Sequence, residues 1–430
     1  MGLILMTISE LVTSRLSPEN WPFSLEYLPQ PVYMVGGAVR DGILGRIREY
    51  MDLDFIIPLN AVKVAKKIAQ HYQAGFVLLD AERQIARVVF PEATVDFAQQ
   101  EGESLTNDLY RRDFTINAIA FNPHTQEIID PLTGYKDIES GILRMISPVN
   151  LQNDPLRLMR AYRQAAQLDF TIEPVTQDTI RSLATSINQV AAERVRVEIG
   201  YLLASGRGTF WLNTAWKDGV LTHLFKNATE KSFIKLNAID QAFALISQKW
   251  QKLGQELMNY VRNTVKTSWL SIAKLACLVD SNPETAEIEL QKLTYSRAEI
   301  RAVTTALRLF SEIKAENMSL RKQYFLFREM GILFPAVLVL ALANDIIDQG
   351  TFAESMFVTY EPLIKRYLNP NDAVAHPIPL LTGKEIMTEL KIPASPLVGE
   401  LLMEVGVAQA EGKISTVEAA IELAKNLIQV

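Results

Sequence analysis

A strand, a glycine turn, a short helix and a second strand follow one another in residues 31–57, which read PVYMVGGAVRDGILGRIREYMDLDFII. The first five residues predict a strand that ends at Gly36-Gly37, and residues 38–44 predict a short helix. Residues 52–57 alternate carboxylate with apolar side chains, which is typical of a strand with one polar face. This order indicates that the chain begins with a mixed α and β region.

The pattern continues outward from this stretch and then changes. Further strands are predicted at 76–79, 85–90 and 94–97, with a helix at 61–72. Strands interleaved with helices indicate a small mixed sheet. From about residue 150 the pattern is helical, with helices that end near 168 and 203. We therefore expect an α+β protein: a small mixed-sheet head at 1–148, an all-helical neck at 149–210, and a helical body and tail at 211–430.

Composition narrows the class of protein. The chain has 430 residues, of which 48% are hydrophobic and 21% charged, and its net charge is −6. These values are ordinary for globular domains, and a nucleic-acid partner would have to meet local basic patches. The single cysteine, Cys277, excludes a disulfide framework and a zinc cluster built on several cysteines.

We expect a cytoplasmic protein with no membrane partner. The longest apolar run, residues 330–343, is shorter than the roughly 20 residues that cross a bilayer. Residues 1–6 are apolar but lack the basic and small-residue parts of a signal peptide. A chain with one cysteine also fits a reducing compartment.

Asp52 and Asp54 carry the first chemical signal. Side chains two residues apart on a strand point to the same face, about 7 Å from each other. Two carboxylates so placed repel each other unless a cation lies between them, and Mg²⁺ prefers oxygen ligands of this kind. Asp96, on another predicted strand, is a candidate third carboxylate. A solvated strand face is the alternative interpretation of the same pattern.

The glycine turn just upstream points to phosphate. Gly36 and Gly37 let a backbone approach a phosphate closely, and the N-terminus of the following helix attracts anions. Arg40 adds a guanidinium that matches phosphate oxygens. A plain tight turn is the alternative, but a phosphate turn beside a metal-binding strand is more specific than either feature alone.

Five motifs in one order resemble those of the class II tRNA nucleotidyltransferase and bacterial poly(A) polymerase family. They are GGAVRD with DLD at 36–54, RRDFTINA at 111–118, DPLTGYKD with LR at 130–144, DPLRLMR at 154–160 and ERVRVE at 193–198. The resemblance implies a polymerase-β-like head and a template-free nucleotidyltransferase. It also implies Mg²⁺ as cofactor, with tRNA, CTP and ATP as partners.

The resemblance assigns roles to the residues of the first two motifs. Asp52 and Asp54 would hold two Mg²⁺ ions, one acting on an RNA 3′-hydroxyl and the other on the triphosphate and the departing pyrophosphate. Asp96 would complete the catalytic carboxylates. The residues implied to grip the nucleotide are Gly36, Gly37, Arg40, Arg112 and Asn117.

The fourth motif carries base selection in this family. Asp154 can accept a hydrogen bond from the amino group of cytosine or adenine while Arg157 donates to the ring, a pattern that uracil and guanine reverse. Arg160 and Arg163 continue the spacing and can reach phosphates or RNA. Asp154 precedes a proline, so a helix N-cap is the alternative. Asn153 stands where the family usually has an acid.

Two further segments have open interpretations. The fifth motif, 193–198, is either a solvated helix with internal ion pairs or a brace for the base-selecting helix. Lysines and arginines recur between 226 and 322 among acids, which is typical of an ordinary surface; a stripe on one side would bind tRNA phosphates.

Residues 97–110 bear on which nucleotides are added. The segment has 14 residues, and the resemblance associates full CCA addition with a longer flexible loop here. We therefore predict CC addition to tRNA 3′ ends, with full CCA addition as the alternative. A poly(A) polymerase and a non-catalytic RNA-binding relative are further alternatives. The former usually has a basic C-terminal extension, and intact motifs argue against the latter.

Overall fold

The computed structural model describes residues 16–46, 50–262, 265–314, 318–350 and 356–428. The apolar start at 1–6, used above for localisation, lies outside these residues. Packing divides the chain into two units, one made of Met1–Glu198 with Phe210–Leu221 and the other of Ile199–Thr209 with Thr222–Val430. Each unit is described separately.

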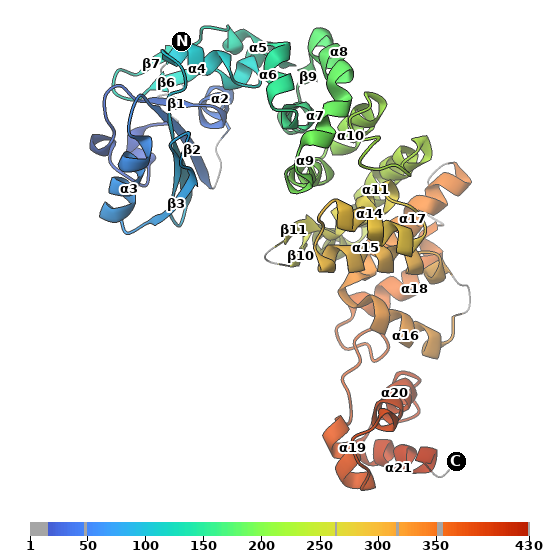
Figure 1. Ribbon diagram of the computed structural model, residues 1–430. Helices are drawn as coiled ribbons and strands as arrows, with labels where there is room; N and C mark the ends of the chain where they lie inside the picture. The colour runs from blue at the N-terminus through green and yellow to red at the C-terminus, as the bar shows by residue number, and fades with distance from the viewer. Residues whose placement is uncertain (1–15, 47–49, 263–264, 315–317, 351–355, 429–430) are drawn as a thin grey trace, which may run out of the picture. The chain divides into compact units, whose positions relative to one another are not determined.

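A seven-stranded mixed sheet forms the core of the first unit (Figure 1). The strands, in order across the sheet, are β3 (Gly75–Asp80), β4 (Ile85–Val89), β5 (Ala93–Gln99), β2 (Met51–Ile57), β1 (Tyr33–Val35), β6 (Ala120–Asn122) and β7 (Glu127–Ile129). Strands β2 and β5 run parallel, and the other pairs are antiparallel. The predicted strands are confirmed, whereas β6 and β7 have only three residues each and are too short to show a period.

The two faces of this sheet differ because side chains alternate along β2. Leu53 and Phe55 are buried on one face, which α3 (Ala61–His71) covers with Ala65 and Ile68. An aromatic cluster fills the same layer, where the rings of Phe55 and Phe97 stack at 5.6 Å. Residues of opposite parity, Asp52 and Asp54 among them, are therefore left on the other face.

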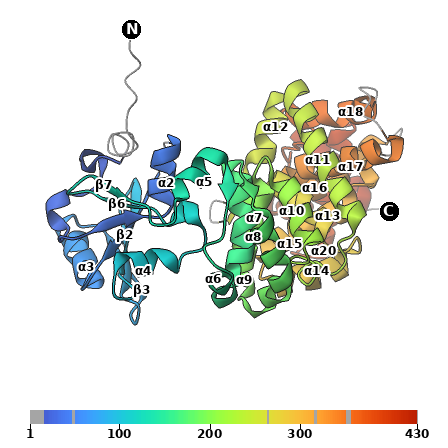
Figure 2. The ribbon, with the colours of Figure 1, turned by 90° about the horizontal axis from the view of Figure 1, so that it is seen from above.

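Helices dominate the remainder of the first unit, and Figure 2 shows α7 and α8 side by side. They are α2 (Gly37–Leu44), α4 (Leu105–Tyr110), α5 (Gly134–Ser140), α6 (Pro148–Asn153), α7 (Leu156–Leu168) and α8 (Pro174–Leu183). Two more, α9 (Ala192–Ala204) and α10 (Gly208–Lys217), each have residues in both units. The expected helices at 38–44, before 168 and before 203 are confirmed as α2, α7 and α9. The neck is not entirely helical, because β8 (Ile142–Leu143) and β9 (Thr171–Ile172) pair in parallel.

The second unit is mostly helical. Its helices are α11 (Glu230–Lys249), α12 (Gln251–Met258), α13 (Trp269–Leu278), α14 (Pro283–Lys292), α15 (Arg297–Leu309), α16 (Leu320–Met330), α17 (Phe334–Gln349), α18 (Met356–Leu368), α19 (Gly383–Leu390), α20 (Pro396–Ala410) and α21 (Val417–Ile428). One antiparallel pair, β10 (Tyr260–Arg262) with β11 (Val265–Ser268), corrects the expectation of an all-helical body. Alternating β-branched residues in these few positions favour strands over a helix.

The apolar run at 330–343 is part of a longer helical stretch than the sequence suggested. Leu320–Gln349 forms 30 residues that are long and apolar enough to cross a membrane by length and composition. However, 72% of its most apolar window is buried inside the protein. Within it, α17 packs against α11, α13 and α15. The stretch is therefore placed as the core helix of the second unit, where burial accounts for its apolar character.

Candidate active site

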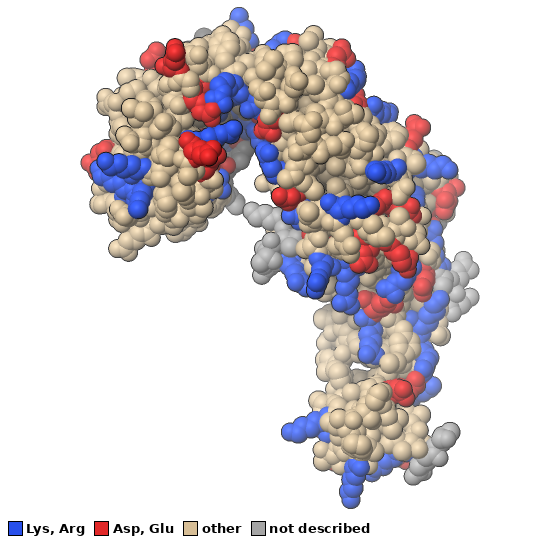
Figure 3. All heavy atoms as spheres, in the orientation of Figure 1, with Lys and Arg blue, Asp and Glu red and all other residues tan. Residues whose placement is uncertain are grey.

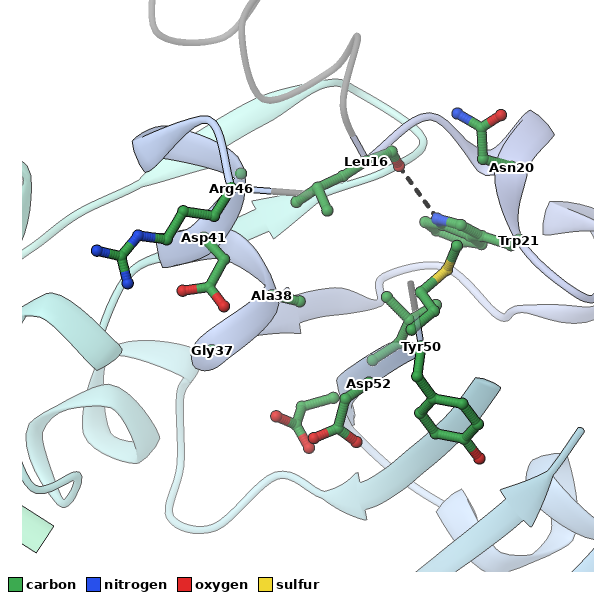
Figure 4. A pocket seen from close by; sticks show the side chains of 13 residues that line it. Leu16, Asn20, Trp21, Gly37, Ala38, Asp41, Arg46, Tyr50 and Asp52 are labelled. Atoms are coloured by element: carbon green, nitrogen blue, oxygen red, sulfur yellow. Dashed lines mark hydrogen bonds between the residues drawn. The ribbon is translucent and has the colours of Figure 1, made fainter. Parts of the chain in front are cut away.

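The predicted carboxylates gather on the open face of the sheet. Asp52 and Asp54 share a face of β2, and Asp54 lies opposite Asp96 in the parallel β2–β5 register. Asp52 accepts a hydrogen bond from the Thr94 hydroxyl at 2.9 Å. Figure 4 shows the Asp52 carboxylate close to the start of α2 at Gly37. The structure thus brings together residues from β2, β5 and the glycine turn.

Asp54 is held in a setting that disfavours its charge. Burial, together with repulsion from Asp52 and Asp96, raises the pKa of the Asp54 carboxyl to about 7. Arg112 and Arg87 oppose this shift without cancelling it. A divalent cation would relieve the repulsion, so the oxygen donors of Asp52 and Asp54 fit such an ion. Among the described residues, no group of three or more His, Cys, Asp or Glu is assembled to hold a metal.

Asp96 is already engaged by a residue that the sequence analysis missed. Arg87, opposite Asp96 on β4, donates from Nε and Nη2 to both carboxylate oxygens, each at 2.7 Å. This bidentate contact raises the pKa of Arg87. The catalytic role predicted for Asp96 therefore stays a prediction, since in this structure its two oxygens face a guanidinium. An alternating pattern in β4 was the only available signal for Arg87.

The glycine turn lets the backbone at Gly36 lie close to the side chains of Asp54 and Arg112. Gly36 has φ +72°, and a Cβ built there would lie 3.2 Å from Asp54 Oδ2 and 3.5 Å from Arg112 Nη1. No side chain caps the N-terminus of α2. The turn therefore brings three features to one place: the N-terminus of a helix, a carboxylate and a guanidinium.

Arg112 has spare hydrogen-bonding capacity. Its nearest acid is Asp108, at 3.5 Å from Nη2. Its Nε is buried and has no hydrogen-bond partner among the described residues. A buried donor without a partner is costly, so this group indicates a ligand site.

Arg40 and Asn117 are placed differently from the expectation that they grip a nucleotide. Arg40 is 7% exposed, and it donates to Asp41 at 2.8 Å and to the Asn117 side-chain oxygen at 2.7 Å. Gln164 of α7 joins the same network and accepts from Asn117 at 2.9 Å. These side chains join α2, the turn at Thr115–Asn117 and α7. The sequence could not show this, because the partners lie far apart along the chain.

Asp113 lies at the centre of the same network. It accepts from Arg160 Nε at 2.9 Å, from the Asn117 amide at 2.9 Å and from the Phe114 N–H at 2.8 Å. Burial opposes ionisation here, but Arg160 and these hydrogen bonds hold the pKa of Asp113 far below its usual range. Asp113 therefore orients its motif, and Arg160 is tied to it.

A polar cavity of about 590 Å³ opens beside this network. Its walls come from the sheet, from the residues around α4 and from α6, α7 and α9. Its charged lining residues are Arg83, Arg111, Arg112, Arg157, Arg160, Arg194, Glu101, Asp108, Asp113 and Asp154. The volume is that of a typical small-molecule site, and the surplus of arginines suits an anionic ligand.

The predicted base-reading pair lies in this cavity. Asp154 Oδ2 is 3.8 Å from Arg157 Nε, and Asp154 Oδ1 is 3.6 Å from Arg194 Nη2. Arg157 also donates to the backbone oxygens of Arg111 and Asn150, at 2.8 and 3.1 Å. Burial lowers the pKa of Arg157. The carbonyls and Arg194 support the pair although Asn153 replaces the usual acid.

Within the described chain, the Asp154 carboxylate makes no hydrogen bond that would cap α7. Pro155 is the N-cap of α7, and no side chain makes a capping hydrogen bond there. The Asp154 backbone oxygen, by contrast, accepts from the Arg157 N–H at 3.0 Å. The Asp154 carboxylate is thus left to face the cavity.

Arg163 does not line this cavity. Its Nε donates to Glu198 of α9 at 2.5 Å, and Glu198 is 5% exposed. Six residues along a helix turn a side chain by about 120°, so Arg163 cannot share the face of Arg157. The Arg163–Glu198 and Arg194–Asp154 contacts both join α7 or its N-terminal end to α9. They favour the brace interpretation of the fifth motif over a solvated helix.

The segment at 97–110 is short and tied down. It comprises the end of β5, a five-residue connection and α4. Glu101 pairs with Arg111, and Asp108 accepts from the Glu101 N–H at 2.9 Å. Glu101 and Asp108 thus pair with Arg111 and Arg112 of the second motif.

Two other observations complete the surroundings. A second cavity of about 120 Å³ lies beside Asp52, lined by Leu16, Trp21, Tyr50 and residues of α2 (Figure 4). In the face shown in Figure 3, lysines and arginines are interspersed with acids.

Three family models match the chain in succession. Residues 32–144 match the poly(A) polymerase head domain. Residues 169–231 match an RNA- and SrmB-binding site of polymerase A, and residues 263–424 match domain 2 of tRNA nucleotidyltransferases.

Whole-chain relatives agree with these models. A CC-adding tRNA nucleotidyltransferase of Synechocystis is 46% identical over 99% of both chains. An A-adding tRNA nucleotidyltransferase of Deinococcus radiodurans is 30% identical over 91% of this chain and 94% of its own. The solved structure of a Thermotoga maritima CCA-adding enzyme with tRNA matches with a TM-score of 0.68 at 20% identity, over 98% of this chain and 99% of that one.

Proposed function

The chain belongs to the tRNA nucleotidyltransferase family, and on that premise we propose that it adds two cytidines to tRNA 3′ ends from CTP, without a template. The observation that carries this proposal is the arginine-lined cavity of about 590 Å³ in which Asp154 and Arg157 stand side by side. It adjoins a turn that brings Arg112 close to Asp54. A nucleotide can thus meet base-reading groups and catalytic carboxylates together.

The cavity side chains select and hold the nucleotide. Asp154 accepts from the cytosine amino group while Arg157 donates to the ring, so uracil would leave both groups mismatched and buried. Arg112, whose Nε has no partner among the described residues, and the N-terminus of α2 bind the triphosphate. The hydrogen bonds among Arg40, Asn117 and Asp113 hold α2, the Thr115–Asn117 turn and α7 together.

Asp52 and Asp54 provide the metal site. The family uses a divalent metal, and Mg²⁺ suits carboxylate oxygen donors from two side chains on one strand face. Bound there, it would supply charge neutralisation for the phosphoryl transfer. The tRNA 3′-hydroxyl attacks the α-phosphate in line, and pyrophosphate leaves on the opposite side. Gly36 keeps this face open because any side chain would crowd Asp54.

The choice of CC rests on residues 97–110. An enzyme that adds A after two C residues must accept a larger base in the same pocket. This change needs a segment near the pocket that can adopt two arrangements. Here the segment after β5 is short, and Glu101 and Asp108 fasten it to its own surroundings. The Synechocystis relative, at 46% identity, is a CC-adding enzyme. Full CCA addition is the alternative.

The remaining expectations are carried forward as parts of this proposal. We keep the division into a catalytic head at 1–148, a neck with the base-selecting helix at 149–210, and a tRNA-binding body and tail at 211–430. We also propose that the enzyme works in the cytoplasm.

The test is a primer-extension assay. A tRNA lacking its 3′ end is incubated with each nucleoside triphosphate alone and in pairs, and product lengths are read on a gel. CTP alone should extend the tRNA by two residues, and ATP should add little to a tRNA ending in CC. Efficient A addition would replace CC by CCA addition, whereas no addition of C would overturn the proposed activity.

A further inference from the structure

Arg83 is a lining residue of the nucleotide cavity that no motif contains. It lies in the turn between β3 and β4, and its side chain is exposed. The other arginines of the cavity each have an acid nearby: Arg111 has Glu101, Arg112 has Asp108, Arg160 has Asp113, and Arg157 and Arg194 share Asp154. Within the described chain, Arg83 has no such acid. It is a cationic group available to a ligand.

The turn holds Arg83 in a fixed place. Asp80 Oδ1 accepts from the N–H groups of Glu82 and Arg83, at 3.0 and 2.9 Å. Gln84, with φ +52°, donates from its side chain to the Ala81 oxygen at 2.7 Å. The turn therefore holds its own backbone in place, so the guanidinium extends from a prepared position.

The order of the strands separates the two substrates. The glycine turn that follows β1 lies on one side of β2, whereas β5 and β4 lie on the other. In-line transfer requires the attacking hydroxyl and the departing pyrophosphate to lie on opposite sides of the α-phosphate. With the triphosphate at the glycine turn, the RNA end must approach Asp52 and Asp54 over β5 and β4.

Arg83 lies on that approach. The β4–β5 register sets Arg87 opposite Asp96 and Ile85 opposite Ala98. The β3–β4 turn therefore begins about 7–10 Å beyond Asp96 along the strands. This distance places Arg83 away from the α-phosphate, toward a phosphate further back in the RNA chain.

We infer that Arg83 binds a backbone phosphate at the 3′ end of the tRNA and positions its terminal hydroxyl for attack. The inference rests on the proposed function, and it adds a primer-binding residue to it. The same guanidinium could instead serve the triphosphate, and the experiment below separates these two sources of phosphate.

The test compares Arg83→Ala and Arg83→Lys with the wild type. Lys66→Ala is the matched control, because Lys66 is an exposed cation on α3 that does not line the cavity. We expect Arg83→Ala to raise KM for the tRNA about five- to tenfold while leaving Kd for CTP, measured without tRNA, unchanged. It should also lower the salt dependence of tRNA affinity by about 0.7 in the log–log slope. Arg83→Lys should restore part of the loss.

A modified RNA sharpens the result. Replacing the phosphate that joins the last two nucleotides by a neutral methylphosphonate should weaken use of the RNA by the wild type but not by Arg83→Ala. A rise in Kd for CTP with no change in KM for tRNA would assign Arg83 to the triphosphate and overturn the inference. Kinetics equal to those of Lys66→Ala would overturn it as well. An inactive wild type would instead disprove the proposed function. In that case a tRNA-binding assay that compares the wild type with Arg83→Ala would still test the role of Arg83.

Discussion

Two aspartates of the first unit, the half-buried Asp54 and the buried Asp113, have surroundings that shift their pKa values in opposite directions. Asp54 meets two other carboxylates, and its pKa is raised to about 7. Asp113 meets Arg160, Asn117 and a backbone N–H, and its pKa is far below the usual range. The first site has a deficit of positive charge that a ligand can fill. The second is complete within the protein and serves as scaffold.

The strongest test of this contrast removes the carboxylates proposed to be catalytic. Asp52→Ala or Asp54→Ala should reduce CMP incorporation at saturating Mg²⁺ by at least about 100-fold, because the charge of the transferred phosphate is no longer offset. Circular dichroism should show an intact fold. Glu92→Gln, an exposed acid of the same unit, is the control. Near-normal incorporation by either variant would contradict the metal assignment.

Removing the scaffold aspartate should act on stability first. Asp113→Asn should lower the free energy of unfolding by about 1–3 kcal/mol at pH 7, because the half-buried Arg160 guanidinium loses its charged partner. Since the folded pKa of Asp113 is lowered, its contribution is present above pH ~4 and is lost as the pH falls below it. Urea unfolding at pH 7 and at pH 3–4 measures the difference. An equal loss at both pH values would show that packing, not charge, is responsible.

A third prediction concerns the proposed base-reading pair, Asp154 and Arg157. Asp154→Ala with Arg157→Ala should relax discrimination against UTP by about tenfold to a hundredfold, as a bidentate base contact gives roughly 1–3 kcal/mol. Single-nucleotide incorporation with each triphosphate gives the ratio. Glu361→Ala with Lys365→Ala removes an exposed ion pair on α18 and serves as control. Unchanged selectivity would remove Asp154 and Arg157 from base choice.

The smallest expected effect is a gain in stability. With EDTA present, Asp54→Asn should raise the free energy of unfolding at pH 8 by about 1–2 kcal/mol, because it removes a like charge. The raised pKa of Asp54 means that the penalty grows as pH rises from ~4 through about 7. The gain should therefore vanish near pH 4. Thermal unfolding at the two pH values measures the change in stability. A lower stability of Asp54→Asn than of the wild type at pH 8 would contradict the proposed repulsion among the carboxylates.

Local patterns predicted most of the sheet and the main residues proposed to be catalytic. Alternation in 52–57 and the glycines before α2 are short-range signals, so both strands, the helix and the pair Asp52–Asp54 follow from them. Short elements such as β6 and α6 carry too few residues to show a period. The proposed base-reading pair followed from motif resemblance. That the Asp154 carboxylate makes no capping hydrogen bond to α7 could be seen only in the structure around Pro155.

The sequence by itself determined the family, the order of the elements and the residues that face one another across one or two turns. Only the tertiary structure decided which arginines have partners. Arg40 is bound by Asn117 and Gln164, 77 and 124 residues away, while Arg83, outside every motif, lines the polar cavity. Charge type and spacing are written along the chain, but the availability of a charge depends on what folding places next to it.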